Sequence, residues 1–255
     1  MNPTNAGCDL LCICPHTDDA EIALGGTLAL LARAGRKVWV CDLTRGELGS
    51  NGTPEERWRE AAEASAHLGL TGRLQFELPD GFVDVGAPEQ VATVAAVIRR
   101  LRPRWIATAP MPNRHPDHRA IGALVEKAAF MSRLAAWSPD LPAHRIWDGG
   151  ALLPDPTDRW QTEAVLHVCL EGEQADVLFD VSSVWDKKLA ALKAYATQFE
   201  AVGERRPTMI NDPAFLEQVE RWARARGFRA GVSHAEALRT SAAPLLSDLP
   251  QERWT

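Results

Sequence analysis

Segments typical of buried strands alternate with segments typical of helices over residues 9–109, and this alternation restricts the fold more than any other feature. The strand-like segments are residues 9–15, 37–44, 74–78 and 105–109, and the helix-like segments are residues 20–34, 54–68 and 89–102. Strands that are joined through helices form parallel sheets whose two faces are covered. The sequence therefore predicts an α/β fold with a Rossmann-like, mostly parallel sheet and helices on both faces.

The second half of the chain is less regular. Its helix-like segments are residues 121–136, 184–198 and 213–227, while residues 137–163 are rich in Pro, Asp and Trp and are expected to be irregular. Residues 165–170 and 176–181 are strand-like, and we expect them to form an antiparallel pair at the sheet edge. Because the sequence shows no internal repeat and no clear linker, we expect one domain over residues 1–255 that ends in a small strand and helix extension.

Composition disfavours several classes of protein. The formal net charge is -6 and the sequence has no basic stripe, so a nucleic-acid partner is disfavoured. No stretch approaches the roughly 18 uninterrupted apolar residues of a transmembrane helix, and the first residues lack the features of a signal peptide, so we expect no membrane partner. The 5 cysteines are odd in number and favour buried, reduced thiols in a cytoplasmic protein.

A polar segment follows each of the four predicted parallel strands. In chain order these segments contain His16, Asp18 and Asp19, then residues 45–53, then Asp80, then residues 110–118. In open α/β sheets, ligands bind beyond the carboxyl ends of the strands. We therefore expect the four segments to meet at one edge of the sheet and to form the functional site there.

The sequence NRHPDH contains two histidines, and together with the first polar cluster it offers a metal site. His16, Asp19 and His118 would supply two imidazoles and one carboxylate, a ligand set for catalytic zinc or for non-haem iron(II). Asp18 would be free to act as general base, and His115 would face the same cavity to stabilise an oxyanion or protonate a leaving group. An aspartate at a helix start is most often a cap, so the hypothesis depends on both clusters lying at one sheet edge.

Nucleotide-binding motifs are missing where this fold would carry them. No G-x-G-x-x-G follows the first strand, because Gly25 and Gly26 come too late, inside the predicted helix. There they would allow the helix to pack closely on the sheet. The sequence has no Gly-x-x-x-x-Gly-Lys phosphate loop either, so it disfavours dinucleotide or nucleoside triphosphate binding.

Two motifs resemble those of a known family. The segments PHTDDAEIALGGT and NRHPDHR are similar to the two signatures of the zinc-dependent N-acetylglucosaminyl deacetylases, the PIG-L or LmbE-like family. Further blocks, among them TRGELGSNGTPEERWREAAEASAHLGL and LPDGFVD, also resemble this family. The blocks FDVSSVWDKKLAALKAYATQF and GVSHAEAL are similar to those of its bacillithiol branch, the N-acetylglucosaminyl-malate deacetylases. The resemblance extends over residues 9–238 and implies a single LmbE-like deacetylase domain.

This resemblance implies a role for each polar residue at the sheet edge. It makes His16, Asp19 and His118 the ligands of a Zn²⁺ ion, with Fe²⁺ as an alternative, Asp18 the general base and His115 the support of the tetrahedral intermediate. These are the residues that the predicted sheet topology would bring together. The activity implied is metal-dependent hydrolysis of an N-acetylglucosamine conjugate, a small-molecule substrate, by a homo-oligomer such as the hexamers of this branch.

The malate conjugate carries two carboxylates, so its site should present fixed cations, and arginine binds carboxylates through two parallel hydrogen bonds. The candidates are Arg57, Arg114 and Arg45 for carboxylates, and Ser50, Asn51 and Asp80 for sugar hydroxyls. Other substrates of the family remain open, namely N-acetylglucosaminyl-inositol, chito-oligosaccharides and thiol S-conjugates.

Two positions depart from the family pattern. Thr17 stands where relatives usually have proline, and we expect threonine to be tolerated because the ligands flank it. His234 stands where many relatives have an aromatic residue, often tyrosine. If this position helps to bind the intermediate, the role passes to a histidine or is lost; otherwise His234 is a packing or surface residue.

Two other classes of protein compete with the deacetylase hypothesis. A non-catalytic sugar-binding protein would have no need of a base such as Asp18 beside the metal. An iron(II) oxygenase would need oxygen and is expected to have a different fold.

Overall fold

The computed structural model describes residues 7–108, 115–149, 158–169, 173–200 and 203–240. Within this part of the chain, one sheet of eight strands runs in the order β5-β3-β2-β1-β4-β6-β8-β7. The strands are β1 (Cys8–Cys14), β2 (Val38–Thr44), β3 (Gly72–Leu78), β4 (Pro103–Thr108), β5 (Arg145–Trp147), β6 (Ala164–Val168), β7 (Val177–Asp180) and β8 (Ala235–Thr240).

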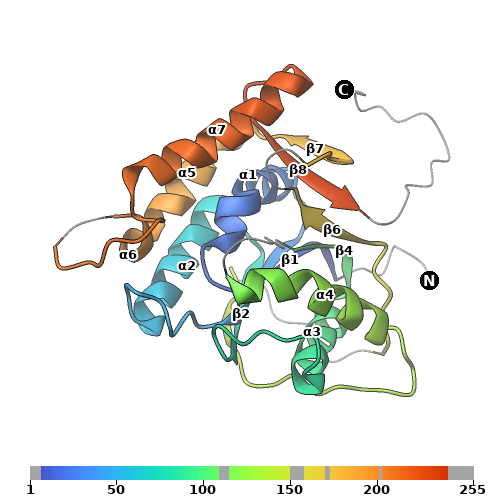
Figure 1. The fold of residues 1–255 in the computed structure, drawn as a ribbon. Helices are drawn as coiled ribbons and strands as arrows, with labels where there is room; N and C mark the ends of the chain where they lie inside the picture. Colours follow the sequence, from blue (N-terminus) through green and yellow to red (C-terminus); the bar gives the residue numbers. More distant parts are fainter. Residues whose placement is uncertain (1–6, 109–114, 150–157, 170–172, 201–202, 241–255) are drawn as a thin grey trace.

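Helices cover both faces of the sheet, which confirms the predicted α/β class. They are α1 (Asp19–Arg33), α2 (Pro54–Leu68), α3 (Pro88–Leu101), α4 (Pro116–Met131), α5 (Trp185–Ala194), α6 (Ala196–Phe199) and α7 (Pro213–Ala230). Helices α3 and α4 pack on one face, and α1, α2, α5 and α7 pack on the other (Figure 1). None of the helices in the described ranges is long and apolar enough to cross a membrane.

The parallel part of the sheet contains β3, β2, β1, β4 and β6, with β1 at its centre. Leu11 of β1 is paired with Trp39 of β2 on one side and with Ile106 of β4 on the other. From β1 the chain passes to β2 and β3, and then returns through α3 to β4 on the far side of β1. This reversal of direction places the segments after β1 and β4 side by side, at the point where open α/β sheets bind ligands.

Alternate side chains of β1 enter two different cores. Leu10 and Cys12 pack with α1, α2 and α5, whereas Leu11 and Ile13 pack with α3 and α4. Because successive side chains of a strand point to opposite faces, a strand covered on both faces must be apolar throughout. The sequence CDLLCIC meets this requirement and fixes β1 in the middle of the sheet.

Helix α2 has strong local signals at both ends, and its predicted bounds coincide with the observed ones. The Thr53 hydroxyl accepts a hydrogen bond from the Glu56 N–H (3.2 Å), and the Glu56 carboxylate accepts one from the Thr53 N–H (2.8 Å). Such caps stabilise a helix by about 1 kcal/mol. Pro54 occupies the first turn, where its missing N–H costs nothing, and Gly69 ends the helix in the left-handed conformation (φ 73°).

Helix α4 begins at Pro116, whereas the sequence pattern predicted a start at residue 121. Proline suits the first helical position, and the His115 ring accepts a hydrogen bond from the Asp117 N–H through Nδ1 (3.3 Å). The early start places His118 in the first turn of α4, and therefore at the carboxyl edge of the sheet.

The C-terminal half differs from the prediction in pairing. Strands β6 and β7 lie at the expected edge but do not pair with each other, because β8 lies between them and is antiparallel to both. The predicted helix over residues 184–198 is divided into α5 and α6 at Tyr195, whose ψ of 61° leaves the helical range. Strand β5 pairs with β3 inside a region that the sequence pattern left irregular.

A buried ion pair between Glu236 and Lys188 forms hydrogen bonds with backbone groups in the middle of α1. The carboxylate of Glu236 on β8 accepts from the N–H groups of Gly26 (3.0 Å) and Thr27 (2.7 Å), which in a regular helix would donate to carbonyls one turn earlier. The Lys188 ammonium on α5 donates to one of those carbonyls, that of Ile22 (2.8 Å), and to Glu236 (2.6 Å). The backbone of α1 is thus satisfied by two side chains that come more than 150 residues later in the sequence.

We predict that Lys188→Met lowers the free energy of unfolding by about 3–5 kcal/mol, because it leaves the Glu236 carboxylate buried without its partner. Urea denaturation measures the change. The matched control is Arg221→Met, which breaks an ion pair to Glu217 whose side chains are 68% and 66% exposed. It should cost less than about 1 kcal/mol. Equal losses in the two variants would contradict a structural role for the buried pair.

Candidate metal centre and active site

The structure brings the two predicted polar clusters together. His16 and Asp18 occupy the turn between β1 and α1, and Asp19 is the first residue of α1. His115 and His118 lie at the start of α4, after β4. The ring centroids of His16 and His115 are 4.6 Å apart, and those of His16 and His118 are 5.4 Å apart. Because β1 and β4 are neighbours in the sheet, residues about a hundred positions apart meet at one edge.

Three of these side chains can hold a metal ion. His16, Asp19 and His118 are buried, and each offers one ligand atom such that these atoms lie within 4.8 Å of one another. One Asp19 oxygen lies 3.2 Å from His16 Nδ1, and the other lies 3.2 Å from His118 Nε2. Two imidazoles and one carboxylate facing a common point fit a catalytic zinc or iron(II) site.

Two further carboxylates lie on the other side of the His16 ring. Nε2 of His16 is 3.0 Å from Asp80 and 3.2 Å from Asp117. A histidine that binds a metal through one ring nitrogen usually donates its other N–H to a carboxylate, which fixes the tautomer. This arrangement assigns the Nε2 proton to the Asp80 and Asp117 side and leaves Nδ1, beside Asp19, as the nitrogen for a metal.

Asp117 is the site residue that the sequence pattern did not assign. It is fully buried, and its carboxylate accepts from the N–H groups of Gly81 (2.8 Å) and Val83 (3.0 Å) as well as facing His16. Its position between the two histidines of NRHPDH was the available signal. Through these contacts Asp117 joins the segment after β3 to the ring of His16.

Asp18 has a conformation and an environment that a helix cap does not need. Its φ of 89° is left-handed, a strained backbone for a residue other than glycine, and its side chain makes no capping hydrogen bond to α1. The residue is 3% exposed, and Oδ2 has no hydrogen-bond partner among the described residues. Burial raises the pKa of Asp18 to about 7, although the charge of Arg57 opposes this rise.

Arg57, predicted to bind substrate, is 5% exposed and is engaged with the protein itself. Its guanidinium donates to the carbonyls of Gly46 (3.1 Å) and Thr17 (3.0 Å) and lies 3.6 Å from the Asp18 carboxylate. A Cβ on Gly46 would collide with Arg57 Nη1, so only glycine allows this approach. Thr17 is fully buried and is held through its carbonyl by Arg57.

The Asp19 carboxylate and the His16 ring each shift the pKa of the other. Burial disfavours the charge on Asp19, but the neighbouring His118 and His16 outweigh it and hold the pKa of this carboxyl well below its usual range. Burial likewise disfavours protonated His16, but its hydrogen bonds to Asp117, Asp19 and Asp80 raise the pKa of the ring. A carboxylate that stays ionised is what a cation requires of its ligand.

His115 is the most exposed of the three histidines, with 43% of its side chain accessible. Because Nδ1 accepts from the Asp117 N–H, a neutral ring carries its proton on Nε2, which makes Nε2 a hydrogen-bond donor. Burial and the nearby charge of His16 lower the pKa of His115, which favours this neutral form.

Three buried charges hold the first turn of α1 against the sheet. Arg73 of β3 binds both oxygens of Asp42 on β2 (2.6 and 2.8 Å) and one oxygen of Glu21 (2.6 Å). Arg73, Asp42 and Glu21 are fully buried, so this cluster fixes the position of the turn that carries Asp18 and Asp19.

The other predicted substrate-binding residues occupy different environments. Asp80 lies in the site beside His16, and Ser50 is exposed in the loop after β2. The Asn51 side chain is used by the protein, since it donates to the Arg206 carbonyl (2.9 Å) and accepts from the Arg206 N–H (2.9 Å). Arg114 lies outside the described residues.

Arg45 and His234 have partners away from the metal-capable cluster. Arg45 forms an ion pair with Glu77 (3.2 Å). The ring of His234 stacks on that of Trp185 (centroids 4.4 Å apart, 10° between planes), and its Nε2 lies 3.7 Å from Glu220. These contacts favour the packing role for His234.

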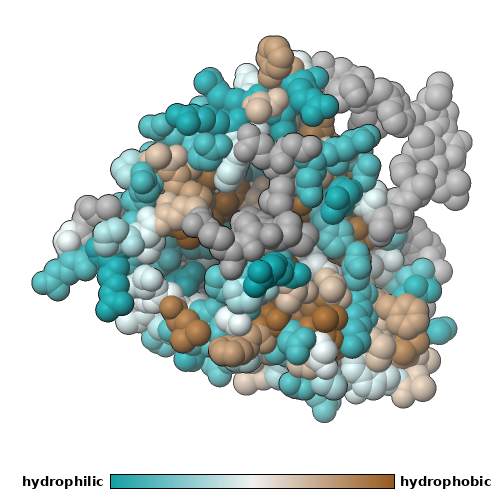
Figure 2. Space-filling view, viewed as in Figure 1, coloured by the Kyte–Doolittle hydropathy of each residue, from teal (hydrophilic) through white to brown (hydrophobic). Residues whose placement is uncertain are grey.

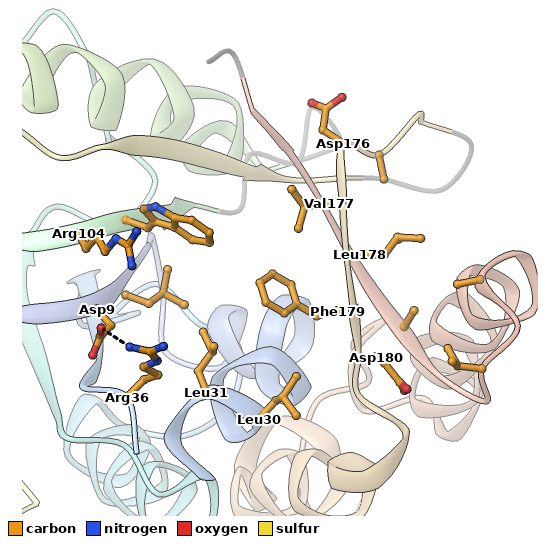
Figure 3. A pocket seen from close by; sticks show the side chains of 16 residues that line it. Asp9, Leu30, Leu31, Arg36, Arg104, Asp176, Val177, Leu178, Phe179 and Asp180 are labelled. Carbon is orange, nitrogen blue, oxygen red and sulfur yellow. Dashed lines mark ion pairs between the residues drawn. The ribbon is translucent and has the colours of Figure 1, made fainter. Parts of the chain in front are cut away.

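A separate groove of about 870 Å³ opens between β7 and the end of α1 (Figure 3). Leu30, Leu31 and Phe179 face it, and it is bordered by the Arg36–Asp9 ion pair (3.5 Å). Asp9 lies near the amino end of β1, whereas His16 and Asp19 follow the carboxyl end of β1 and His118 follows that of β4. The residues that line this groove include no histidine, so the candidate active site is the cluster at the other edge.

Comparison with known proteins gives the same family that the motifs resemble. The family model described as PIG-L, GlcNAc-PI de-N-acetylase, matches residues 11–129. The Bacillus cereus protein named "Probable N-acetyl-alpha-D-glucosaminyl L-malate deacetylase 2" is 31% identical over 208 residues, which cover 76% of this chain and 86% of that protein. A 1D-myo-inositol 2-acetamido-2-deoxy-alpha-D-glucopyranoside deacetylase of Mycolicibacterium gilvum is 28% identical over 86% of this chain and 91% of that protein.

Among solved structures, the conserved protein TT1542 of Thermus thermophilus superposes with a TM-score of 0.78 at 34% identity, over 97% of this chain and 100% of that one. The similarity therefore extends from the two motifs to the whole sheet and its helices. Because the identity to the Bacillus cereus relative reaches 31% over 76% of the chain, this chain belongs to the PIG-L family, the GlcNAc-PI de-N-acetylases.

Proposed function

We propose that this protein is a zinc-dependent hydrolase that removes the acetyl group from an N-acetylglucosamine conjugate. One observation carries the proposal: ligand atoms of His16, Asp19 and His118 lie within 4.8 Å of one another, beside the strained and buried Asp18. A sugar-binding protein could use the cluster, but it would gain nothing from a left-handed aspartate held beside it.

Each residue of the site has a defined part in amide hydrolysis. His16, Asp19 and His118 would hold the ion, which when bound polarises the acetyl carbonyl and lowers the pKa of a water molecule. Asp18 accepts a proton from the attacking water and later gives it to the leaving amine. His115 donates its Nε2–H to the carbonyl oxygen as negative charge develops there. Acetate and a free amino sugar are the products, so atoms and charges balance.

For the conjugate we propose the malate glycoside of N-acetylglucosamine as substrate. The Bacillus cereus relative bears the name of an L-malate deacetylase, and the C-terminal blocks of the chain resemble that branch. The inositol glycoside is the second candidate, because it is named for the Mycolicibacterium relative. Arg57 supports the site by holding the turn around Asp18, which leaves Arg114 as the proposed carboxylate partner.

Oligomeric state and location complete the proposal. A homo-oligomer, such as a hexamer, stays a prediction that light scattering of the purified protein would test. So does a cytoplasmic location, which cell fractionation would test. Neither enters the mechanism, since every residue proposed for the reaction comes from one chain.

We predict that Asp18→Asn reduces kcat by about 10³-fold, because the amide is nearly isosteric but cannot accept the proton. The assay is amine release from the malate glycoside, with the metal content measured on the same sample. Asp186→Asn, an exposed position on α5, is the matched control and should keep full activity. Full turnover by the Asp18 variant with its metal retained would refute the mechanism.

Metal removal gives a second test. Treatment with a chelator should abolish amine release, and Zn²⁺ should restore it in the wild type but not in His118→Ala, which lacks one ligand. His67→Ala, at an exposed histidine of α2, controls for loss of a surface histidine and should respond like the wild type. Restoration by Fe²⁺ alone, under anaerobic conditions, would overturn the choice of zinc.

The choice of conjugate is tested by comparing kcat/KM for the malate and inositol glycosides. We expect the malate glycoside to be preferred by about tenfold or more, the effect of one charge-assisted hydrogen bond to a carboxylate. A preference for the inositol glycoside would assign the chain to the other substrate and leave the chemistry of the site unchanged.

A further inference from the structure

Two exposed apolar side chains lie on the loops that build the candidate active site. Large hydrophobic side chains are exposed at seven of the described positions, namely Leu48, Phe82, Phe130, Leu134, Ile146, Met209 and Phe228. Leu48 is 67% exposed and follows β2, and Phe82 is 68% exposed and follows β3. Strands β2 and β3 both end at the carboxyl edge of the sheet, so Leu48 and Phe82 lie at the same edge as the metal-capable cluster.

The backbone of Leu48 is fixed to the site through Asp80. The Leu48 N–H donates to one Asp80 oxygen (2.9 Å), and the other Asp80 oxygen lies 3.0 Å from His16 Nε2. A Cβ on Gly81 would lie 3.6 Å from Leu48 Cδ1, so the Leu48 side chain lies over the residue that precedes Phe82. Leu48 and the Phe82 backbone are therefore next to each other.

The backbone around Phe82 is fixed through Asp117. The residues on either side, Gly81 and Val83, both donate to the Asp117 carboxylate, which lies 3.2 Å from His16 Nε2. The Phe82 carbonyl accepts from the side chain of Gln90 (3.0 Å). Phe82 therefore presents an uncovered phenyl ring from a backbone that is fixed on both sides to a carboxylate of the site.

We propose that Leu48 and Phe82 form an apolar platform at the entrance of the site and that the C–H face of the substrate's sugar ring packs on it. The proposal rests on the proposed function, because it takes the substrate to be an N-acetylated sugar. Small-molecule sites combine a few polar groups with mostly apolar walls. The side chains of His16, Asp19, Asp80 and Asp117 are engaged with one another, so the platform supplies an apolar contact that they do not.

Such a platform has a distinct kinetic signature. The sugar ring does not change its apolar face during amide hydrolysis, so the contact stabilises the substrate and the transition state equally. Contacts of this kind lower KM and leave kcat unchanged. The effect should also be the same for conjugates that differ only in the group attached to the sugar.

The competing occupant of this surface is a second copy of the chain. Figure 2 shows hydrophobic side chains among hydrophilic ones on the lower half of the molecule, where Figure 1 places α3 and α4. We favour the substrate because the N–H groups of Leu48 and of Gly81, which precedes Phe82, donate to Asp80 and Asp117. Both of these carboxylates face His16. Exposed residues elsewhere, such as Phe228 on α7, have no comparable connection to the site.

The test is Phe82→Ala, assayed on the malate and inositol glycosides. KM should rise about tenfold for whichever conjugates are turned over, with kcat within about twofold of wild type. Phe82→Trp should restore KM, because it returns an aromatic face. Phe228→Ala, which removes a phenyl ring that is 86% exposed, is the matched control and should leave both constants unchanged. Because Phe82 is exposed, loss of folding is not expected to obscure the result.

A binding measurement separates this proposal from the proposed function. Calorimetric titration of Asp18→Asn and of the Asp18→Asn/Phe82→Ala double variant should show about tenfold weaker binding of the glycoside to the double variant, without any need for turnover. An unchanged KM and dissociation constant would overturn the platform and leave the deacetylase intact. A fall in oligomer mass of Phe82→Ala in light scattering, with KM unchanged, would assign the surface to a second copy instead. Turnover by Asp18→Asn would refute the mechanism alone.

Discussion

The site depends first on the carboxylate of Asp19. One of its oxygens accepts from the His16 N–H (2.9 Å) and faces the ring of the same residue, while the other faces His118 (3.2 Å) on a different helix. This contact joins the turn after β1 to the helix after β4 and would be maintained by a bound cation. It is possible only because β1 and β4 are adjacent parallel strands. The order of strands in the sheet therefore determines which side chains can meet in the site.

Rigidity around that carboxylate comes from two buried arginines. Arg57 holds the carbonyl of Thr17, and Arg73 holds Glu21. Asp18 stays in its left-handed conformation between these two anchors, and the cost of that strain is met by the surrounding hydrogen bonds. Arg57, which the sequence suggested as a ligand for an anionic substrate, thus serves to position Asp18.

Sequence alone predicted the elements with strong local signals and the residues that follow strands. The bounds of α2 and the meeting of His16 with His118 came from capping residues and strand order, which are readable along the chain. The position of Asp117 between the two histidines of NRHPDH was a signal that it lies in the site, but its contacts with His16, Gly81 and Val83 could not be predicted, because they join loops far apart in the sequence. The insertion of β8 between β6 and β7 was missed for the same reason, since pairing partners depend on the packed structure.

Helix α1 is completed from the far end of the chain. The segment that matches the family model, residues 11–129, contains all five residues proposed for the chemistry, yet two N–H groups of α1 find their acceptor on Glu236 and one carbonyl finds its donor on Lys188. The family motifs and the cooperative folding unit therefore do not coincide. A fragment cut at the boundary of the family model would keep every residue proposed for the reaction and lose the support of the helix that presents Asp18 and Asp19.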